Sequence, residues 1–433
     1  MMIRAAAAAV ILSLTVGPTA CRAQTPYLPF ERPAPGKTVC GAPVCGAEFL
    51  APAFLKLEAA GGTGEGGFHI LQVGDSHTAG DQISGQVRSR MQARFGRGGR
   101  GILPPGLPYT GYAPRQVSLS ATGARYLPAP LIAGGTRVRM GLAGGRGRLE
   151  AGDHLSLILD PGVPLTTIGV CGQAGPDRGT LHIVPEIGLP QSIDFRRDTA
   201  GPLCAEVALS PGDASLTLVA ADAPVVLDDV RLWGKGGLSL SNLGVVGSTL
   251  MDLEGRDAPT VEAQLRADPP DLILLAYGVN EGFDGALDPV AYEQVLRARI
   301  AWLRQVAPDA ALMILAAPEG LRRTTMAPGT TPGPQRWSQT CGRQGEWQAP
   351  PGLAMVRDVQ RRVSEDLGVA FWDWYGRMGG ACSADRLAGI DEPLVRGDRV
   401  HFTATGAEWI GDILADDLMT TYDDWRASRT GGD

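Results

Sequence analysis

The sequence lacks several features that would assign it to a common class of protein. It has no cluster of Lys and Arg residues, no Gly-X-Y period and no Cys-x-x-Cys pair, and only five of its 433 residues are histidines. Nucleic-acid binding needs a dense basic face, so a chain with a net charge of -7 and no such cluster is a poor candidate. The missing period excludes a collagen-like fold. A hydrophobic content of 44% excludes disorder and suffices for a large core.

The first 23 residues have the pattern of a secretory signal peptide. Arg4 precedes about a dozen apolar residues, and small residues up to Ala23 suit cleavage there, whereas a spanning helix needs about 20 apolar residues. No later segment is apolar over that length, so we expect an exported, soluble protein without a transmembrane segment, in the periplasm or at the cell envelope. Cys21 leaves a lipid anchor open, because Thr-Ala-Cys resembles the end of a lipoprotein box. Pro18, however, stands where that box usually has Leu.

The six remaining cysteines favour disulfides over a metal site. An even number of cysteines in an exported chain is typical of a disulfide framework, and no histidine stands at ligand spacing from any of them. We therefore predict neither a metal nor a cofactor. Six cysteines allow fifteen pairings, and proximity in the sequence favours Cys40–Cys45, Cys171–Cys204 and Cys341–Cys382.

The pattern of apolar residues divides the chain into segments of different character. Residues 24–65 are rich in Pro, Gly and Ala and are interpreted as a leader that packs loosely. A strand at 69–73 and a helix at 78–95 follow, ending in a glycine-rich stop at 96–101. Strands then alternate with helices again after residue 237, as expected for a doubly wound parallel sheet. The predicted elements of this second part are strands at 238–245, 271–277, 311–316 and 369–374, and helices at 248–267, 289–306, 353–367 and 405–420.

The segment between these parts has hardly any helical pattern. Short β-type runs alternate with Gly and Pro turns, at 136–140, 155–159, 181–184, 214–219 and 225–232. We therefore predict an all-β sandwich at 115–235, inserted into an α/β domain made of residues 66–114 and 236–425.

Polar residues follow the apolar runs at three points, where a doubly wound sheet gathers functional groups. They are Gly-Asp-Ser-His at 74–77, Tyr-Gly-Val-Asn-Glu at 277–281 and Asp-Arg-Val-His at 398–401. Taken singly, each also fits a turn, a helix cap or a surface loop. A nucleophilic serine needs a base and a carboxylate that orients it. His69 lies in the first predicted strand, and His154 and His182 lie in the predicted β insert. His77 adjoins Ser76 too closely to face it, which leaves His401 with Asp398 three residues before it.

In this order, the motifs resemble the four blocks of the SGNH (GDSL) hydrolase superfamily. The resemblance implies a flavodoxin-like α/β fold, with Ser76 as nucleophile and Asp398 and His401 as orienting acid and base. It also implies an oxyanion hole made of the Ser76 amide, the Gly247 amide and the Asn280 side chain. His77 and Glu281 depart from the common blocks, which have Leu and Asp there. Both occur in the bacterial peptidoglycan O-acetylesterases, which also carry a β-sandwich, carbohydrate-binding-module-like domain between the first two blocks.

The resemblance implies an esterase that removes O-acetyl groups from the C6 hydroxyl of N-acetylmuramic acid. The residues leave open another acetylated glycan, such as xylan or a capsule or matrix polysaccharide, an acetyl transfer, or a non-catalytic glycan-binding protein. Arg97, Arg100 and Arg115 form a candidate basic patch for an anionic polymer, with a solvated loop as the alternative. We expect Asp75 to cap the following helix, and Trp372 and Trp374 to pack in the core.

Overall fold

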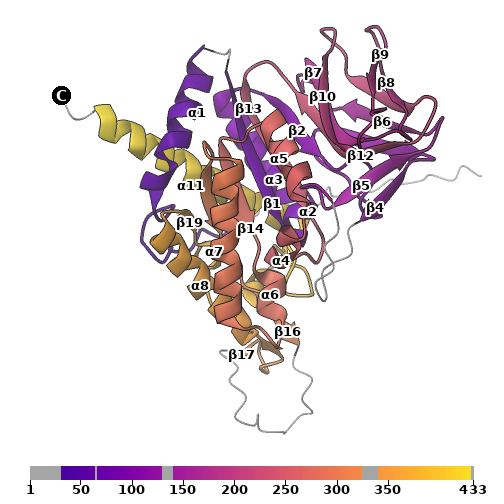
Figure 1. Cartoon of the computed structure of the whole chain (residues 1–433). Coiled ribbons are helices and arrows are strands. Elements are labelled where there is room, and N and C mark those ends of the chain that lie inside the picture. The colour runs from indigo at the N-terminus through magenta and orange to yellow at the C-terminus, as the bar shows by residue number, and fades with distance from the viewer. Residues whose placement is uncertain (1–30, 64–65, 129–139, 324–339, 431–433) are drawn as a thin grey trace, which may run out of the picture. The chain divides into compact units, whose positions relative to one another are not determined.

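The computed structural model describes residues 31–63, 66–128, 140–323 and 340–430 (Figure 1). Described residues from Ala34 onward belong to one compact unit. The predicted signal peptide and Cys21 lie outside the described residues. Within the described ranges, no helix has the length and apolar character needed to cross a membrane.

A five-stranded, all-parallel sheet forms the centre of the α/β part, as predicted. In spatial order its strands are β13 (Gly237–Gly244), β1 (Gly67–Gly74), β14 (Leu272–Ala276), β15 (Ala311–Leu315) and β19 (Ala370–Trp372). Numbered along the chain, this order is 2-1-3-4-5, that of the flavodoxin-like folds. The runs of buried residues in these strands follow from helices covering both faces.

Helices cover the two faces of this sheet in two groups (Figure 1). Leu71 and Val73 of β1 pack in one hydrophobic cluster with α5 (Ala258–Ala267), α7 (Pro289–Val306) and α8 (Pro351–Leu367). The alternate residues of β1 point the other way. There the second group packs: α1 (Ala51–Thr63), α3 (Gln82–Phe95) and α11 (Ala404–Thr430).

The inserted segment is a sandwich of two antiparallel sheets around one core. One sheet has the order β10-β7-β12-β5-β4, with β2 also paired to β12, and the other has the order β3-β6-β11-β8-β9. Their inward side chains form a single cluster. The strands are β2 (Gly99–Leu103), β3 (Val117–Thr122), β4 (Arg125–Pro128), β5 (Gly145–Leu149), β6 (His154–Leu159), β7 (Thr167–Ala174), β8 (Thr180–Pro185), β9 (Gln191–Asp194), β10 (Gly201–Ala208), β11 (Ser215–Ala220) and β12 (Val225–Trp233).

Four of the five predicted strands of the insert are present, as β6, β8, β11 and β12. The fifth, predicted at 136–140, falls largely outside the described residues. The glycine-rich stop at 96–101 differs from its prediction, because β2 begins there and pairs with β12 of the sandwich. A Cβ at Gly99 would meet the Leu232 carbonyl oxygen at 2.6 Å, so glycine permits the close approach of two backbones.

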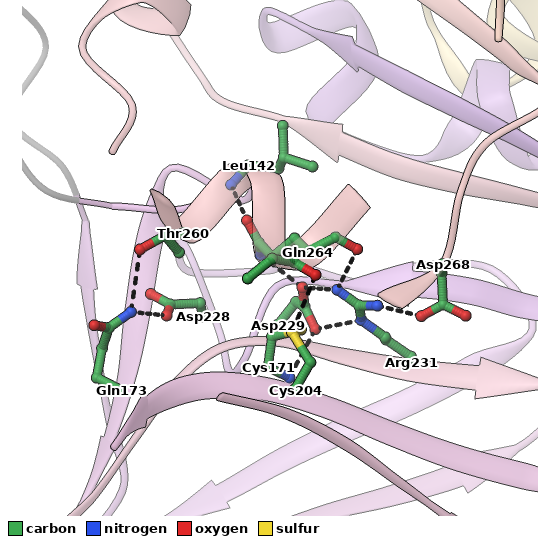
Figure 2. The surroundings of a disulfide bond; sticks show 11 residues. Leu142, Cys171, Gln173, Cys204, Asp228, Asp229, Arg231, Thr260, Gln264 and Asp268 are labelled. Atoms are coloured by element: carbon green, nitrogen blue, oxygen red, sulfur yellow. Dashed lines mark hydrogen bonds and ion pairs between the residues drawn. A yellow bond between two sulfur atoms is a disulfide. The ribbon is translucent and has the colours of Figure 1, made fainter. Parts of the chain in front are cut away.

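A buried polar network joins the sandwich to α5 beside the Cys171–Cys204 disulfide (Figure 2). Arg231 on β12 donates to both carboxylate oxygens of Asp229, at 2.8 and 2.9 Å, and to the main-chain oxygen of Gln264 on α5 at 3.1 Å. Gln264 in turn donates to Asp229 at 2.6 Å and accepts from the Leu142 amide at 2.9 Å. The insert is therefore joined to the α/β part through buried hydrogen bonds.

The leader prediction is wrong for its second half. Residues 47–50 form a 3-10 helix and Ala51–Thr63 form α1. Leu50 of the first helix and Phe54 and Leu57 of the second are buried. Their spacing of four and three residues is a helical signal that was masked by the surrounding Ala and Gly. Cys45 also pairs its backbone with Phe371 in β19, at 2.9 Å in both directions, so this segment packs tightly.

The predicted helix at 78–95 is broken into two. It consists of α2 (Ser76–Ala79) and α3, separated by Asp81 in a left-handed conformation with φ of 51°. The break turns the Asp81 side chain into the core, where it meets two arginines. The three disulfides favoured by sequence proximity are all present, and Trp372 and Trp374 are buried, as expected.

Candidate active site

The sheet brings three of the predicted site residues to one edge. Gly74 at the end of β1 lies in register with Gly244 of β13 and with Ala276 of β14. Ser76, Gly247 and Asn280 follow these strand ends by two to four residues, so they emerge at the same carboxyl edge. The strand order changes direction at β1, and open α/β sheets bind ligands at such a point.

Ser76, His401 and Asp398 form a continuous chain of hydrogen bonds. Ser76 Oγ lies 3.0 Å from His401 Nε2, and His401 Nδ1 lies 2.8 Å from Asp398 Oδ2. The other oxygen of Asp398 accepts from the backbone amides of Val400 and His401, at 2.9 and 3.0 Å. This carboxylate therefore fixes both the turn and the ring, and leaves Nε2 to take the serine proton.

These hydrogen bonds also determine the charge of Asp398. Partial burial raises the pKa of the carboxyl, but hydrogen bonds from the His401 amide and ring outweigh burial and lower it below the usual value. Asp398 is consequently ionised at neutral pH, as a group that stabilises an imidazolium must be.

The turn that carries Ser76 is held by its own residues. Asp75 caps α2 by accepting from the His77 amide at 2.9 Å, as expected. A Cβ at Gly74 would meet the Ala276 carbonyl oxygen at 2.6 Å and Thr78 Oγ1 at 2.4 Å. Only glycine thus lets β1 approach β14 so closely where the chain turns toward Ser76.

His77 links the first block to the last one and is not the base. Its Nδ1 lies 3.2 Å from Asp75 Oδ1 and its Nε2 lies 3.0 Å from the Val400 carbonyl oxygen. Burial lowers the pKa of His77, but the hydrogen bond and charge of Asp75 raise it further, so the net shift is upward. An acceptor therefore lies beside each ring nitrogen, so the protonated form of His77 can donate to both. It also stacks on His401 with centroids 5.4 Å apart, which supports the catalytic turn.

The second and third blocks are joined beside the nucleophile. Gly247 has a φ of 75°, in the loop before α4 (Leu250–Glu254). Asn280 lies in α6 (Val279–Phe283) and donates one side-chain N–H to the Ser248 carbonyl oxygen at 2.8 Å. Glu281 accepts from the Leu250 amide at 2.7 Å. The chain directly after Gly247 is therefore held at two points by the block that contains Asn280.

Glu281 is a buried carboxyl with one oxygen that has no hydrogen-bond partner among the described residues. Burial raises its pKa to about 7, despite the backbone hydrogen bond from Leu250. A carboxyl whose pKa is higher in the folded state stabilises the protein below its ordinary pKa of 4.5, and this stabilisation is lost as the pH rises through about 7.

Glu281→Gln should therefore remove one component of the pH dependence of stability. Between pH 5 and pH 8, the free energy of unfolding of the wild type should fall by about 1–3 kcal/mol relative to that of this variant. Urea unfolding curves at the two pH values measure the difference. Glu365→Gln on the exposed side of α8 is the control, expected to shift the midpoint equally at both pH values. If the difference in unfolding free energy between Glu281→Gln and the wild type were the same at both pH values, the raised pKa of Glu281 would be refuted.

Ser76 and His401 line a pocket of about 510 Å³. Tyr109, Val246 and Phe402 contribute apolar surface, and Tyr109 is fixed by donating its hydroxyl to the Ala79 carbonyl oxygen at 3.0 Å. An acetyl group would fill only a small part of this volume, so the pocket has room for a neighbouring part of a larger substrate. Among the described residues, no group of three or more His, Cys, Asp or Glu side chains could hold a metal ion.

The predicted basic patch is not present, and of its three arginines only Arg97 is exposed to solvent. Arg100 is fully buried and pairs with Asp81 at 2.8 Å, while Arg115 pairs with Glu408 at 3.0 Å. Arg97 donates to the Gly162 carbonyl oxygen in the sandwich at 2.6 Å. These contacts join segments that are distant in the sequence, so residue spacing contains no signal of them. Sequence reasoning also missed the linking roles of His77 and Glu281, and the presence of Arg396 in the pocket.

Comparisons with known proteins show what the chain is similar to. The model of the GDSL-like Lipase/Acylhydrolase family matches residues 229–409, a range that includes Gly247, Asn280, Asp398 and His401 but begins within β12 and so leaves out Ser76. A search of the curated proteins gives no match.

Among solved structures, the chain is similar to one described as "Peptidoglycan O-acetylesterase in action, 5 min". The two are 25% identical with a TM-score of 0.71, over 86% of this chain and 96% of the other. A family two carbohydrate esterase from Cellvibrio japonicus is 12% identical with a TM-score of 0.27, over 71% of this chain and 98% of that one. The latter likeness is too low to support an argument about function.

Proposed function

The chain belongs to the GDSL-like lipase/acylhydrolase (SGNH) family, whose members are carboxylic ester hydrolases, and on this premise we propose a specific activity. The protein is an exported serine esterase that removes O-acetyl groups from a cell-envelope polysaccharide. The polysaccharide is peptidoglycan, acetylated at the C6 hydroxyl of N-acetylmuramic acid. Three disulfides are consistent with export, because such bonds persist in oxidising compartments.

The hydrogen-bonded chain from Ser76 through His401 to Asp398 is the observation on which the proposal depends. His401 takes the proton of Ser76 as the serine attacks the acetyl carbonyl carbon, and Asp398 stabilises the resulting imidazolium. His401 then protonates the leaving sugar oxygen, which leaves an acetyl-serine. It next activates a water molecule that releases acetate and restores the serine.

The negative oxygen that develops on the carbonyl needs donors. We assign this role to the Ser76 and Gly247 amides and to the Asn280 side chain, which emerge at the same edge of the sheet. Asn280 uses one side-chain N–H on Ser248, and the other has no partner among the described residues, so it is available to the oxyanion.

The choice of peptidoglycan is supported by the structural relative whose description names that substrate. The test is acetate release from O-acetylated peptidoglycan and from acetylated xylan, side by side. Faster release from peptidoglycan is expected. Faster release from xylan would place the enzyme on another glycan, and no release from either, nor from p-nitrophenyl acetate, would contradict an esterase. We further propose that the sandwich at 115–235 binds glycan as a carbohydrate-binding module does.

Asn280→Ala should lower kcat for p-nitrophenyl acetate by about 100- to 1000-fold, because it removes one donor to the oxyanion. KM should change little, since the donor acts mainly on the charge that forms in the transition state. Steady-state kinetics measure both constants. A wild-type kcat in this variant would show that Asn280 is not a donor to the oxyanion.

A further inference from the structure

The pocket that contains Ser76 has one strongly basic side chain in its wall. Arg396 lines it together with His401 and Phe402, and the described residues of the lining include no Asp or Glu. The protein as a whole has a net charge of -7, so a pocket lining with one arginine and no carboxylate departs from the overall balance. Such a site favours an anion over a neutral group.

The position of Arg396 is fixed by the catalytic turn. Its backbone amide donates to the His401 carbonyl oxygen at 2.7 Å, and its Nε donates to the Phe402 carbonyl oxygen at 2.9 Å. The guanidinium is thereby held by one of its nitrogens, while the N–H groups of Nη1 and Nη2 remain available. A planar guanidinium held in this way can donate two parallel hydrogen bonds to a carboxylate.

Other arginines around the site are already paired. Arg399, three residues further along the same turn, lies 3.1 Å from Asp385 and over the ring of Trp347. Arg100 and Arg115 pair with Asp81 and Glu408, as described above. No ion pair involves Arg396 among the described parts of the chain, so its partner is not an acidic side chain in these ranges.

We propose that Arg396 binds a carboxylate of the substrate, so that the enzyme prefers acetylated glycans that carry a carboxylate on or next to the acetylated sugar. The inference rests on the esterase function proposed above and narrows its substrate class. The pocket extends beyond the space that an acetyl group needs, which leaves room for such a neighbour. In acetylated muramic acid, the carboxylate comes from the lactyl ether or from an attached peptide, whereas neutral xylan offers none.

Three substrates that differ only in this group test the proposal. They are 6-O-acetyl-N-acetylmuramic acid, its primary carboxamide, and the same sugar with an alanyl-isoglutamine dipeptide on the lactyl group. Acetate release gives kcat/KM for each. The wild type should prefer one of the carboxylates over the carboxamide by about tenfold or more, and added salt should reduce this preference. The faster of the two acids identifies where the carboxylate is carried.

Arg396→Gln should bring the ratio of carboxylate to carboxamide rates close to one, and Arg396→Lys should retain part of it. If loosening of the turn lowered the activity of the variant, the rates on both substrates would fall together. The ratio of the carboxylate rate to the carboxamide rate therefore reports only the recognition of charge. The control is Arg125→Gln on β4, an exposed residue outside the pocket lining, which changes the net charge equally and should keep the ratio.

The outcomes separate this inference from the proposed function. Equal rates on all three substrates in the wild type, or a preference that survives in Arg396→Gln, would overturn the role of Arg396 and leave the esterase standing. Failure to release acetate from any of the three, or from other acetyl esters, would instead refute the proposed function itself.

Discussion

Ser76→Ala is expected to lower kcat for acetyl ester hydrolysis by roughly 10⁴- to 10⁶-fold, the largest effect of any single change in this protein. No acetyl-enzyme can form without the serine oxygen, and the base and oxyanion donors that remain provide only residual rate enhancement. The rate of p-nitrophenol release measures the loss, and intact-protein mass spectrometry shows whether an acetyl group is still trapped.

The fold should tolerate this change. The only hydrogen bond found for the Ser76 hydroxyl among the described residues is the one to His401, so its removal leaves no buried group newly unpaired and the melting temperature should stay the same. Ser89→Ala on α3 is a matched control, because this exposed serine only donates to the Gly85 carbonyl oxygen in its own helix. Esterase activity that persists in Ser76→Ala would show that another residue is the nucleophile.

Asp81→Ala is expected to destabilise the fold by about 3–5 kcal/mol, the largest loss of stability that we predict. Asp81 is fully buried and accepts from Arg88 at 2.9 Å and Arg100 at 2.8 Å, both of them buried, and from the Arg115 amide at 3.0 Å. Burial raises the pKa of Asp81, but Arg100 and Arg88 outweigh burial and lower it to about 2. Without the carboxylate, two buried guanidinium groups lose their counter-ion.

Urea unfolding of the wild type and the variant measures this loss. Asp416→Ala is the matched control, since Asp416 pairs with Arg90 on the surface, where both side chains are about half exposed, and should cost less than about 1 kcal/mol. The lowered pKa of Asp81 also means that its stabilising charge is present above the ordinary pKa of 3.8 and is lost as the pH falls toward 2. A loss no larger than that of the control would contradict a structural role for this cluster.

The architecture was predictable because its elements are locally encoded. The helix at 289–306 begins with a capping Asp288 and Pro289 and shows apolar spacing throughout, and the structure has the same bounds. The buried strands at 272–276 and 311–315 are short apolar runs between turns. The errors fall where long-range contacts override local pattern. At Asp81 the helix is interrupted and the side chain pairs with two buried arginines, and at β2 a glycine-rich stretch pairs with a strand more than one hundred residues later.

The residues that we propose as catalytic could be selected from the sequence for a different reason. Five histidines left one credible base, and a carboxylate three residues before it can reach the ring through a short turn. The structure has that hydrogen bond at 2.8 Å. The roles of His77 and Glu281 could not be assigned in this way, because each depends on a backbone group supplied by another block, at Val400 and Leu250 respectively.

The sequence by itself indicated the type of fold, favoured the three disulfide pairs that are present, and identified the residues that we propose for ester hydrolysis, because periodicity, cysteine proximity and motif order are properties of neighbouring residues. Only the tertiary structure decided what surrounds those residues. It buried Arg100 with Asp81 and placed Arg396 in the pocket of Ser76, without an ion pair among the described residues. Charges in a folded chain are paired or exposed according to segments that meet in space, and the spacing of residues along the chain does not report those meetings.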